Sequence, residues 1–419
     1  MTYFEIEGGV SLKGDVEISG AKNATFPILS AALLAEGESR IKRVPKVLDV
    51  IHFIDILKEL GVEIRENGNE IVMNVGKNVD SVVKRKKERN LRGTQTLLGA
   101  LIAKNGKAVL SSLGGCDIGA RPIDLHLKGL KELGVNIDWQ GGYLKADAKK
   151  LRGSSIYLDF PSVGATENLI IAAVKAEGTT ILENAAREPE IGNLIDFLNK
   201  AGADIHIEGP GVIRIKGVKE LHPVEFSIIP DRIEAATYLI MGAITHGDVL
   251  IKDVRPTDFE PVIMKLEEMG AKIQITDNKV HLLADGRLKG TNIKTLPFPG
   301  FPTDAQPQLM ALLSVSKGTS VITETIFENR FKAAKELRKM GADIKVEYDT
   351  AIINGVEQLE GAEVIAPDLR GGAALVTAAL AAKGKSRILD TYHIDRGYEE
   401  IEKKITKLGG RIVRKNDNI

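Results

Sequence analysis

The chain has 419 residues, 43% hydrophobic and 27% charged, which is typical of a globular protein long enough for two or three domains. Basic and acidic residues both total 57, so the sequence lacks the basic excess that broad binding to nucleic acid or to anionic membranes requires. One cysteine cannot form an intramolecular disulfide, and we see neither a signal peptide nor a run of about 18 apolar residues. We expect a cytoplasmic protein that does not insert into membranes, and no metal site, because cysteine and histidine do not cluster.

An internal repeat runs along the chain. One pattern, as in LKELGVEI, recurs six times, and a second pattern, as in AVKAEGTTIL, precedes each copy by 23 to 28 residues. The glycines of the first pattern are Gly61, Gly134, Gly202, Gly270, Gly341 and Gly409. Those of the second are Gly37, Gly106, Gly178, Gly247, Gly318 and Gly384. Such regular spacing indicates six copies of one structural unit.

Each unit reads as strand, helix, strand, helix, strand, strand. An Ala/Leu-rich helix is expected to end at the first glycine of each unit, which can take the left-handed conformation, and a second helix is expected to end at the second glycine. In the third copy the apolar residues at 191, 194, 195 and 198 form one helix face, and 203–217 reads as a hairpin. We expect an α/β fold with helices inside and sheets outside. Periodicity leaves open whether the units group as three pairs, two trios or one ring.

Four segments carry residues that the repeat does not require. SGAKNA precedes the first helix, where Lys22 and Asn23 are suited to an anion site at a helix N-terminus. The alternative is a solvated lysine and a capping asparagine. FPSVGATEN places Ser162, Val163 and Gly164 at another helix start, either as a phosphate cradle or as an ordinary cap.

The segment GGCDIGARPIDLH contains Cys116 between glycines and close to Arg121. A nearby cation lowers a thiol pKa and makes it reactive, although a lone cysteine is more often a small buried residue. FPGFPTDAQPQ holds Asp304 in a proline-bounded turn, where a helix cap is the simpler interpretation. Arginines also recur in glycine-, proline- or asparagine-containing loops, which favours a convergent anionic site: Arg92, Arg121, Arg330, Arg370 and Arg396.

The following motifs occur in order along the chain: SGAKNA, GGCDIGARPIDLH, SVGAT, ENAAREPEI, PDRIE, FPTD, TETIFENRF, DLR and YHIDRGYE. Together they closely resemble the enolpyruvyl transferase family over residues 1–412. The cysteine segment and ENAAREPEI resemble the members that use UDP-N-acetylglucosamine. The resemblance implies an inside-out α/β barrel fold of two similar domains, each of three βαβαββ-type repeats. Domain one would comprise 1–20 plus 230–419, and domain two, 21–229, would carry the Cys116 loop as a lid.

The resemblance implies a transferase that moves the enolpyruvyl group of phosphoenolpyruvate to the 3-hydroxyl of UDP-N-acetylglucosamine and releases phosphate. This is the first committed step of peptidoglycan precursor synthesis, proceeds through a tetrahedral ketal, and needs no cofactor. Fosfomycin would inhibit it. Catalytic roles would fall to Cys116, Asp304, Lys22 and Arg396. Residues expected to bind substrate are Lys22, Asn23, Arg92, Arg121, Pro122, Ile123, Asp124, Leu125, Ser162, Val163, Gly164, Asp304, Ile326, Arg330, Arg370 and Arg396.

Three segments depart from the family pattern. LRGTQT replaces an MRAS-type segment, Phe160 and Pro161 stand where some members have Lys and Val, and DLRGG has two glycines where Ala or Ser is common. We expect these changes to alter affinity more than reaction type. Two alternatives remain: a transferase with another hydroxyl acceptor, and a non-catalytic paralogue that binds a sugar nucleotide. The sequence does not specify an oligomeric state.

Overall fold

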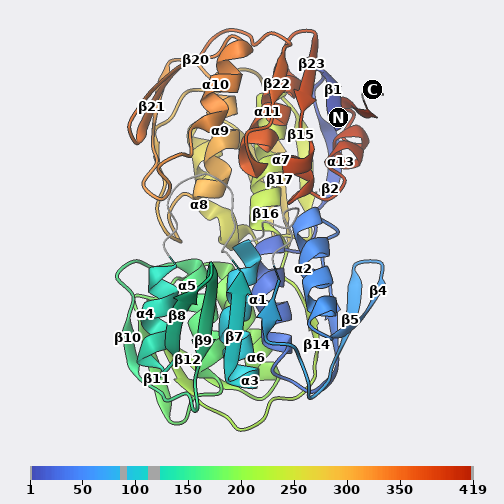
Figure 1. Cartoon of the computed structure of the whole chain (residues 1–419). Coiled ribbons are helices and arrows are strands. Elements are labelled where there is room, and N and C mark those ends of the chain that lie inside the picture. Colours follow the sequence, from blue (N-terminus) through green and yellow to red (C-terminus); the bar gives the residue numbers. More distant parts are fainter. Residues whose placement is uncertain (1, 85–91, 112–122, 417–419) are drawn as a thin grey trace. The chain divides into compact units, whose positions relative to one another are not determined.

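The computed structural model describes residues 2–84, 92–111 and 123–416 (Figure 1). The chain divides into two compact units. Among the described residues, unit 1 comprises 2–19 and 230–416, and unit 2 comprises 20–84, 92–111 and 123–229. The chain thus enters unit 2 after Ser19 and returns to unit 1 at Pro230.

The described strands of unit 2 form three four-stranded sheets with one common order. The first two strands of each sheet are parallel, and the other neighbours are antiparallel. In sheet order the strands are β14 (Glu225–Ser227), β3 (Gly37–Lys42), β5 (Glu70–Val75), β4 (Glu63–Asn67); β6 (Val82–Val83), β7 (Lys107–Ser111), β9 (Tyr143–Asp147), β8 (Asn136–Gln140); and β10 (Ser155–Tyr157), β11 (Thr179–Glu183), β13 (Val212–Lys216), β12 (Asp204–Gly209).

The described strands of unit 1 repeat that order. They are β2 (Lys13–Glu17), β15 (Asp248–Lys252), β17 (Lys279–Leu283), β16 (Lys272–Thr276); β18 (Ile293–Lys294), β19 (Thr319–Thr323), β21 (Thr350–Asn354), β20 (Asp343–Glu347); and β22 (Glu363–Ile365), β23 (Lys385–Leu389), β1 (Thr2–Glu7), β24 (Arg411–Asn416). Three sheets therefore take one strand from a distant part of the chain. β14 takes the first place in the sheet of the first repeat, β2 takes it in that of the fourth, and β1 completes the sixth.

Apolar helices form the centre of each unit. In unit 2, α1 (Lys22–Ala32), α3 (Thr96–Asn105) and α5 (Val163–Ala173) contact one another. In unit 1, α7 (Arg232–Ile244), α9 (Gln306–Leu313) and α11 (Leu369–Ala381) do the same. These helices are buried on nearly every side, because their sequences are rich in Ala, Leu and Ile all round rather than along one stripe.

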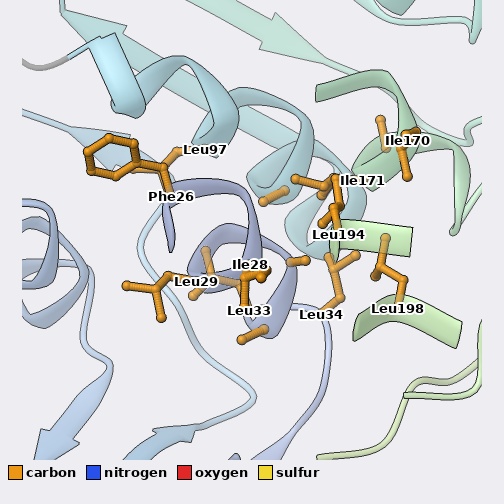
Figure 2. Close-up of a cluster of buried hydrophobic side chains, with 14 of the residues drawn as sticks. Phe26, Ile28, Leu29, Leu33, Leu34, Leu97, Ile170, Ile171, Leu194 and Leu198 are labelled. Carbon is orange, nitrogen blue, oxygen red and sulfur yellow. The ribbon is translucent and has the colours of Figure 1, made fainter. Parts of the chain in front are cut away.

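Amphipathic helices complete the repeats: α2 (Leu48–Glu59), α4 (Asp124–Glu132), α6 (Pro189–Lys200), α8 (Glu260–Glu268), α10 (Lys332–Lys339) and α13 (Ile401–Lys407). Short elements are α12 (Tyr392–Asp395), η1 (Arg92–Gln95), η2 (Pro256–Phe259) and η3 (Thr303–Ala305). On α6 the predicted apolar face is buried, and Figure 2 shows Leu194 and Leu198 beside Leu34 and Ile171 in the core of unit 2. The βαβαββ repeats, with helices inside and sheets outside, are as the sequence predicts.

The expected helix ends are right for one glycine pattern and largely wrong for the other. All six glycines that follow the second helices have φ between 86° and 105°, as helix-terminating glycines do. Most of the first helices end several residues earlier, as α1 does at Ala32, with a turn before the glycine; Gly106 alone caps its helix directly among the described copies. Five of the six glycines that follow the first helices are nevertheless left-handed, with φ between 70° and 108°. Gly247 is the exception, and His246 before it has a positive φ of 52°.

Candidate functional site

Asp304 in unit 1 lies at the centre of a pair of arginines. Arg330 donates from Nη2 to Oδ1 at 2.6 Å, and Arg370 donates from Nη2 to Oδ2 at 3.1 Å. The side chains of both arginines are almost fully buried, 2% and 4% exposed, whereas that of Asp304 is 26% exposed. The helix-cap interpretation is wrong, since Asp304 lies inside η3 and its carboxylate takes the arginines. Two cations that converge on one accessible carboxylate form a centre in which the arginines can bind an anion and the carboxylate can accept a proton.

Arg370 is fixed at the start of α11. Asp368 caps that helix by accepting the backbone N–H groups of Arg370 and Gly371 at 3.0 and 2.9 Å. The guanidinium lies 5.5 Å from the ring centroid of Tyr398, and its Nη1 is buried without a partner among the described residues. Burial works against the charge, but Asp304, Tyr398 and Asp231 together outweigh burial and hold the pKa of Arg370 above its ordinary value. An unpaired buried N–H favours an incoming anionic acceptor.

Ile326 and Arg396 are the other predicted site residues in unit 1. Ile326 is half-buried and follows β19, where its backbone N–H donates to Glu324 at 2.9 Å. Arg396 is half-buried at the C-terminal end of α12. Sequence reasoning missed Glu324, although a signal exists: it continues the inward phase of Ser320 and Ile322 along the strand, where a carboxylate is unexpected.

Lys22 in unit 2 is buried rather than solvated. It is 8% exposed, begins α1, and donates to Oδ2 of Asp49 at 3.0 Å. The capping role considered for Asn23 is also wrong, because the N-cap is Ala21 and provides no side-chain acceptor. Sequence reasoning missed Asp49, since nothing local links two residues 27 positions apart. A buried lysine at an N-terminus without a side-chain cap is suited to an anion.

The helix starts at 123–125 and 162–164 also belong to unit 2. Ser162 caps α5 by accepting the backbone N–H of Ala165 at 3.4 Å, so its predicted cap role is observed. Val163 and Gly164 begin that helix and are half-buried. Ile123 precedes α4, and Asp124 and Leu125 form its first turn, with the two apolar side chains packed on the core.

Next to these helix starts lies His126, which sequence reasoning did not place in the site. A Cβ added at Gly164 would lie 3.4 Å from Nε2 of the imidazole, so the ring covers the first turn of α5. The predictions for Cys116, Arg121 and Pro122 fall outside the described residues. Arg92 begins η1, and only its backbone is described.

Close packing accounts for two of the family departures. In LRGTQT, a Cβ added at Gly93 would lie 2.7 Å from Cγ of Phe26, so the ring occupies the space that an alanine needs. In DLRGG, a Cβ at Gly372 would lie 2.6 Å from Cγ1 of Ile394, and one at Gly371 would lie 2.7 Å from Cγ of Pro367. Both glycine segments thus reflect local packing. Nothing in the structure explains Phe160, which is exposed.

Comparisons with known proteins agree on one family. The family model for EPSP synthase (3-phosphoshikimate 1-carboxyvinyltransferase) matches residues 6–405. UDP-N-acetylglucosamine 1-carboxyvinyltransferase 1 of Symbiobacterium thermophilum is 51% identical over 417 residues, 98% of this chain and 95% of that protein. The enzyme of that name from Clostridium acetobutylicum is 51% identical over 418 residues, 99% of this chain and all of its own.

Solved structures give the same result. The enolpyruvyl transferase NikO from Streptomyces tendae superposes with a TM-score of 0.90 at 25% identity and covers 99% of this chain and 98% of its own. EPSP synthase from Acinetobacter baumannii, at 21% identity, shares the fold with a TM-score of 0.78, covering 99% of this chain and all of its own. No helix in the described part of the chain is long and apolar enough to cross a membrane. The family model and the half-identical relatives show that this chain belongs to the enolpyruvyl (carboxyvinyl) transferase family.

Proposed function

We propose that this protein transfers the enolpyruvyl group of phosphoenolpyruvate to the 3-hydroxyl of UDP-N-acetylglucosamine and releases inorganic phosphate. This reaction opens peptidoglycan precursor synthesis, and we place it in the cytoplasm. Relatives half identical over nearly the whole chain carry the name of this activity. The observation in the structure that supports it best is the accessible carboxylate of Asp304 between two buried arginines.

The reaction is an addition followed by an elimination. An acid protonates C3 of phosphoenolpyruvate, the sugar oxygen bonds to C2 as it loses its proton, and a tetrahedral ketal forms. The C2–O bond to phosphate then breaks, and C3 gives up a proton to restore the double bond. The chemistry requires a base at the hydroxyl, an acid/base at C3 and cations for the carboxylate and phosphate.

Asp304 is proposed as the base at the sugar hydroxyl. Arg330, Arg370 and Arg396 bind the anionic groups of phosphoenolpyruvate, and the free Nη1 of Arg370 offers one such contact. Each of the first two arginines currently shares its charge with Asp304. A bound anion competes for the same guanidinium groups, which leaves the carboxylate available to accept the hydroxyl proton.

In unit 2 we assign phosphoenolpyruvate contacts to Lys22 and Asn23, and sugar-nucleotide contacts to Arg92 and the segments 121–125 and 162–164. Lys22 is suited to its role because it is buried and already holds one carboxylate, that of Asp49. Ile326 contacts the sugar nucleotide. Cys116 supplies the acid/base at C3. We further propose that the two compact units are the domains expected from the repeats, each with three of them.

Phosphate release from phosphoenolpyruvate tests the proposal. We expect release that depends on UDP-N-acetylglucosamine and that persists in excess chelator. Shikimate 3-phosphate serves as the control acceptor, and we expect no release with it. Release with shikimate 3-phosphate alone would instead indicate another acceptor, and binding of UDP-N-acetylglucosamine without release would indicate a non-catalytic paralogue.

A further inference from the structure

The carboxylate of Glu324 collects four hydrogen bonds next to the Asp304 centre. Its Oε1 accepts from the hydroxyl of Thr295 at 2.8 Å and from the backbone N–H groups of Ile326 and Phe327 at 2.9 and 3.3 Å. Its Oε2 accepts from the hydroxyl of Thr303 at 3.0 Å. The side chain of Glu324 thus links the segment that follows β19, through Ile326 and Phe327, to the segment that precedes α9, through Thr303.

Thr303 carries this connection to the two charged groups. Its carbonyl accepts two hydrogen bonds from Arg330, from Nε at 3.2 Å and from Nη2 at 3.1 Å. The same Nη2 donates to Asp304, the residue after Thr303, at 2.6 Å. Glu324, Thr303, Arg330 and Asp304 therefore form a continuous network in which the hydroxyl of Thr303 faces one carboxylate and its carbonyl faces the guanidinium.

Stability alone does not favour a glutamate at this position. Glu324 is 3% exposed, and burying a carboxylate is costly unless its partners compensate. The four groups that donate to it are all neutral. A carboxylate held only by neutral donors is suited to fixing local geometry, because it can accept from several directions at once.

We propose that Glu324, acting through Thr303, is a positioning residue that sets the geometry of Asp304 and Arg330. This inference rests on the proposed function, in which Asp304 takes the proton of the sugar hydroxyl. A base that is displaced from the hydroxyl transfers the proton poorly even when the substrates bind normally. The hydrogen bonds of the network fix η3 in place. Asp304 therefore keeps its position when a bound anion competes for the arginines.

The two carboxylate oxygens of Glu324 accept different numbers of hydrogen bonds, three at Oε1 and one at Oε2, and this makes Glu324→Gln an informative variant. The amide oxygen can keep the three donors at Oε1, while the NH₂ replaces Oε2 and faces the hydroxyl of Thr303. Only the contact with Thr303 then changes. We expect kcat to fall about tenfold with the KM for UDP-N-acetylglucosamine nearly unchanged, because the N–H contact of Ile326 is retained.

A double-mutant cycle isolates the connection. Thr303→Val removes the hydroxyl and should lower kcat by a similar factor, Thr303→Ser should restore it, and the double variant should lose no more than either single one. Thr291→Val is the matched control, because that buried hydroxyl donates to Glu268 at 2.5 Å in the same unit. The control should keep the parent kcat. Parent kcat in Glu324→Gln and Thr303→Val would overturn the proposal.

A second measurement needs no turnover. The Nε–H of Arg330, identified in an NMR spectrum by its loss in Arg330→Lys, donates to Thr303 and reports the network in the free protein. We expect its signal to shift and its hydrogen exchange to accelerate in Thr303→Val but not in Thr291→Val. An unchanged signal would refute the positioning role. If the parent releases no phosphate, the proposed function fails, while this comparison still decides whether Glu324 and Thr303 position Arg330.

Discussion

Asn168 donates its side-chain amide to Nδ1 of His126 at 3.0 Å inside unit 2. The direction is fixed, because Oδ1 of the same amide accepts the backbone N–H of Gly99 at 2.6 Å, which turns the NH₂ group toward the imidazole. Nδ1 therefore accepts, and the ring proton is on Nε2, the nitrogen nearest Gly164. Protonation of Nδ1 would place a donor against a donor.

His126 should make the protein less stable as the pH falls. Burial lowers its pKa to about 4, whereas the unfolded chain takes up the proton near the ordinary value of 6.5. Since the unfolded state binds the proton first, the free energy of unfolding decreases as the pH drops from about 6.5 to 4. The full effect is about 3 kcal/mol. Urea unfolding at pH 7 and pH 4.5 measures it.

Carboxylates titrate in the same range, so the comparison requires variants. His126→Gln should lose stability at pH 7 but show a smaller decrease on acidification than the parent. His222→Gln, at an exposed histidine, is the control and should follow the parent. Equal pH dependence in the parent and His126→Gln would contradict the buried neutral imidazole.

Glu167→Gln should stabilise the protein at neutral pH. Glu167 is buried in α5, and its pKa is raised well above the ordinary value by burial, then by Glu190 and Glu188. A carboxyl whose folded pKa is raised contributes stability that is present below the unfolded pKa and is lost as the pH rises. The amide resembles the protonated form and avoids that loss. The difference in urea midpoint should therefore grow from pH 4 to pH 8, and a parent more stable than the variant at pH 8 would refute this account.

Asp304→Asn should bind both substrates and turn over slowly. The amide keeps the shape and can still accept from one arginine, but it cannot take the hydroxyl proton. Loss of a general base typically lowers kcat by about 10²–10⁴-fold. Phosphate release measures kcat, and calorimetric titration with UDP-N-acetylglucosamine checks that binding is retained. Turnover at the parent rate would remove Asp304 from the base role.

Cys116 should react with fosfomycin, an epoxide that resembles phosphoenolpyruvate, and more readily when UDP-N-acetylglucosamine is bound. Arg121, five residues away, favours the reactive thiolate. Intact-protein mass should show a single adduct in the parent and none in Cys116→Ser. Cys116→Asp should keep activity without an adduct, because a carboxyl can still protonate C3. An unreacted parent thiol would indicate an inert residue.

The repeat was the most predictable part of the fold. Glycines such as Gly61 and Gly202 take the left-handed conformation because a helix must end there, and this requirement is local to each copy. The helical spacing of apolar residues on α6 likewise predicted its buried face. Strand partners were less predictable, since β1 and β14 join sheets whose other strands lie far away in the sequence.

The candidate site, like the strand partners, was only partly predictable from the sequence. Asp304, Arg330 and Arg370 were predicted individually from their loops, and the roles assigned to them remain predictions. Their contact depends on η3, the segment after β19 and the start of α11 meeting at one place. No sequence motif indicated the ion pair between Lys22 and Asp49 or the hydrogen-bond network of Glu324, because the residues involved come from separate elements.

The sequence by itself determined the repeating α/β unit, the helix ends after the second glycines and the family, because these depend on local periodicity and on ordered motifs. Only the tertiary structure decided which strand completes each sheet, that Lys22 is buried beside Asp49, and that two arginines share Asp304. Those features depend on side chains brought together over tens to hundreds of residues. Their energies come from burial and charge pairing, which local sequence does not encode.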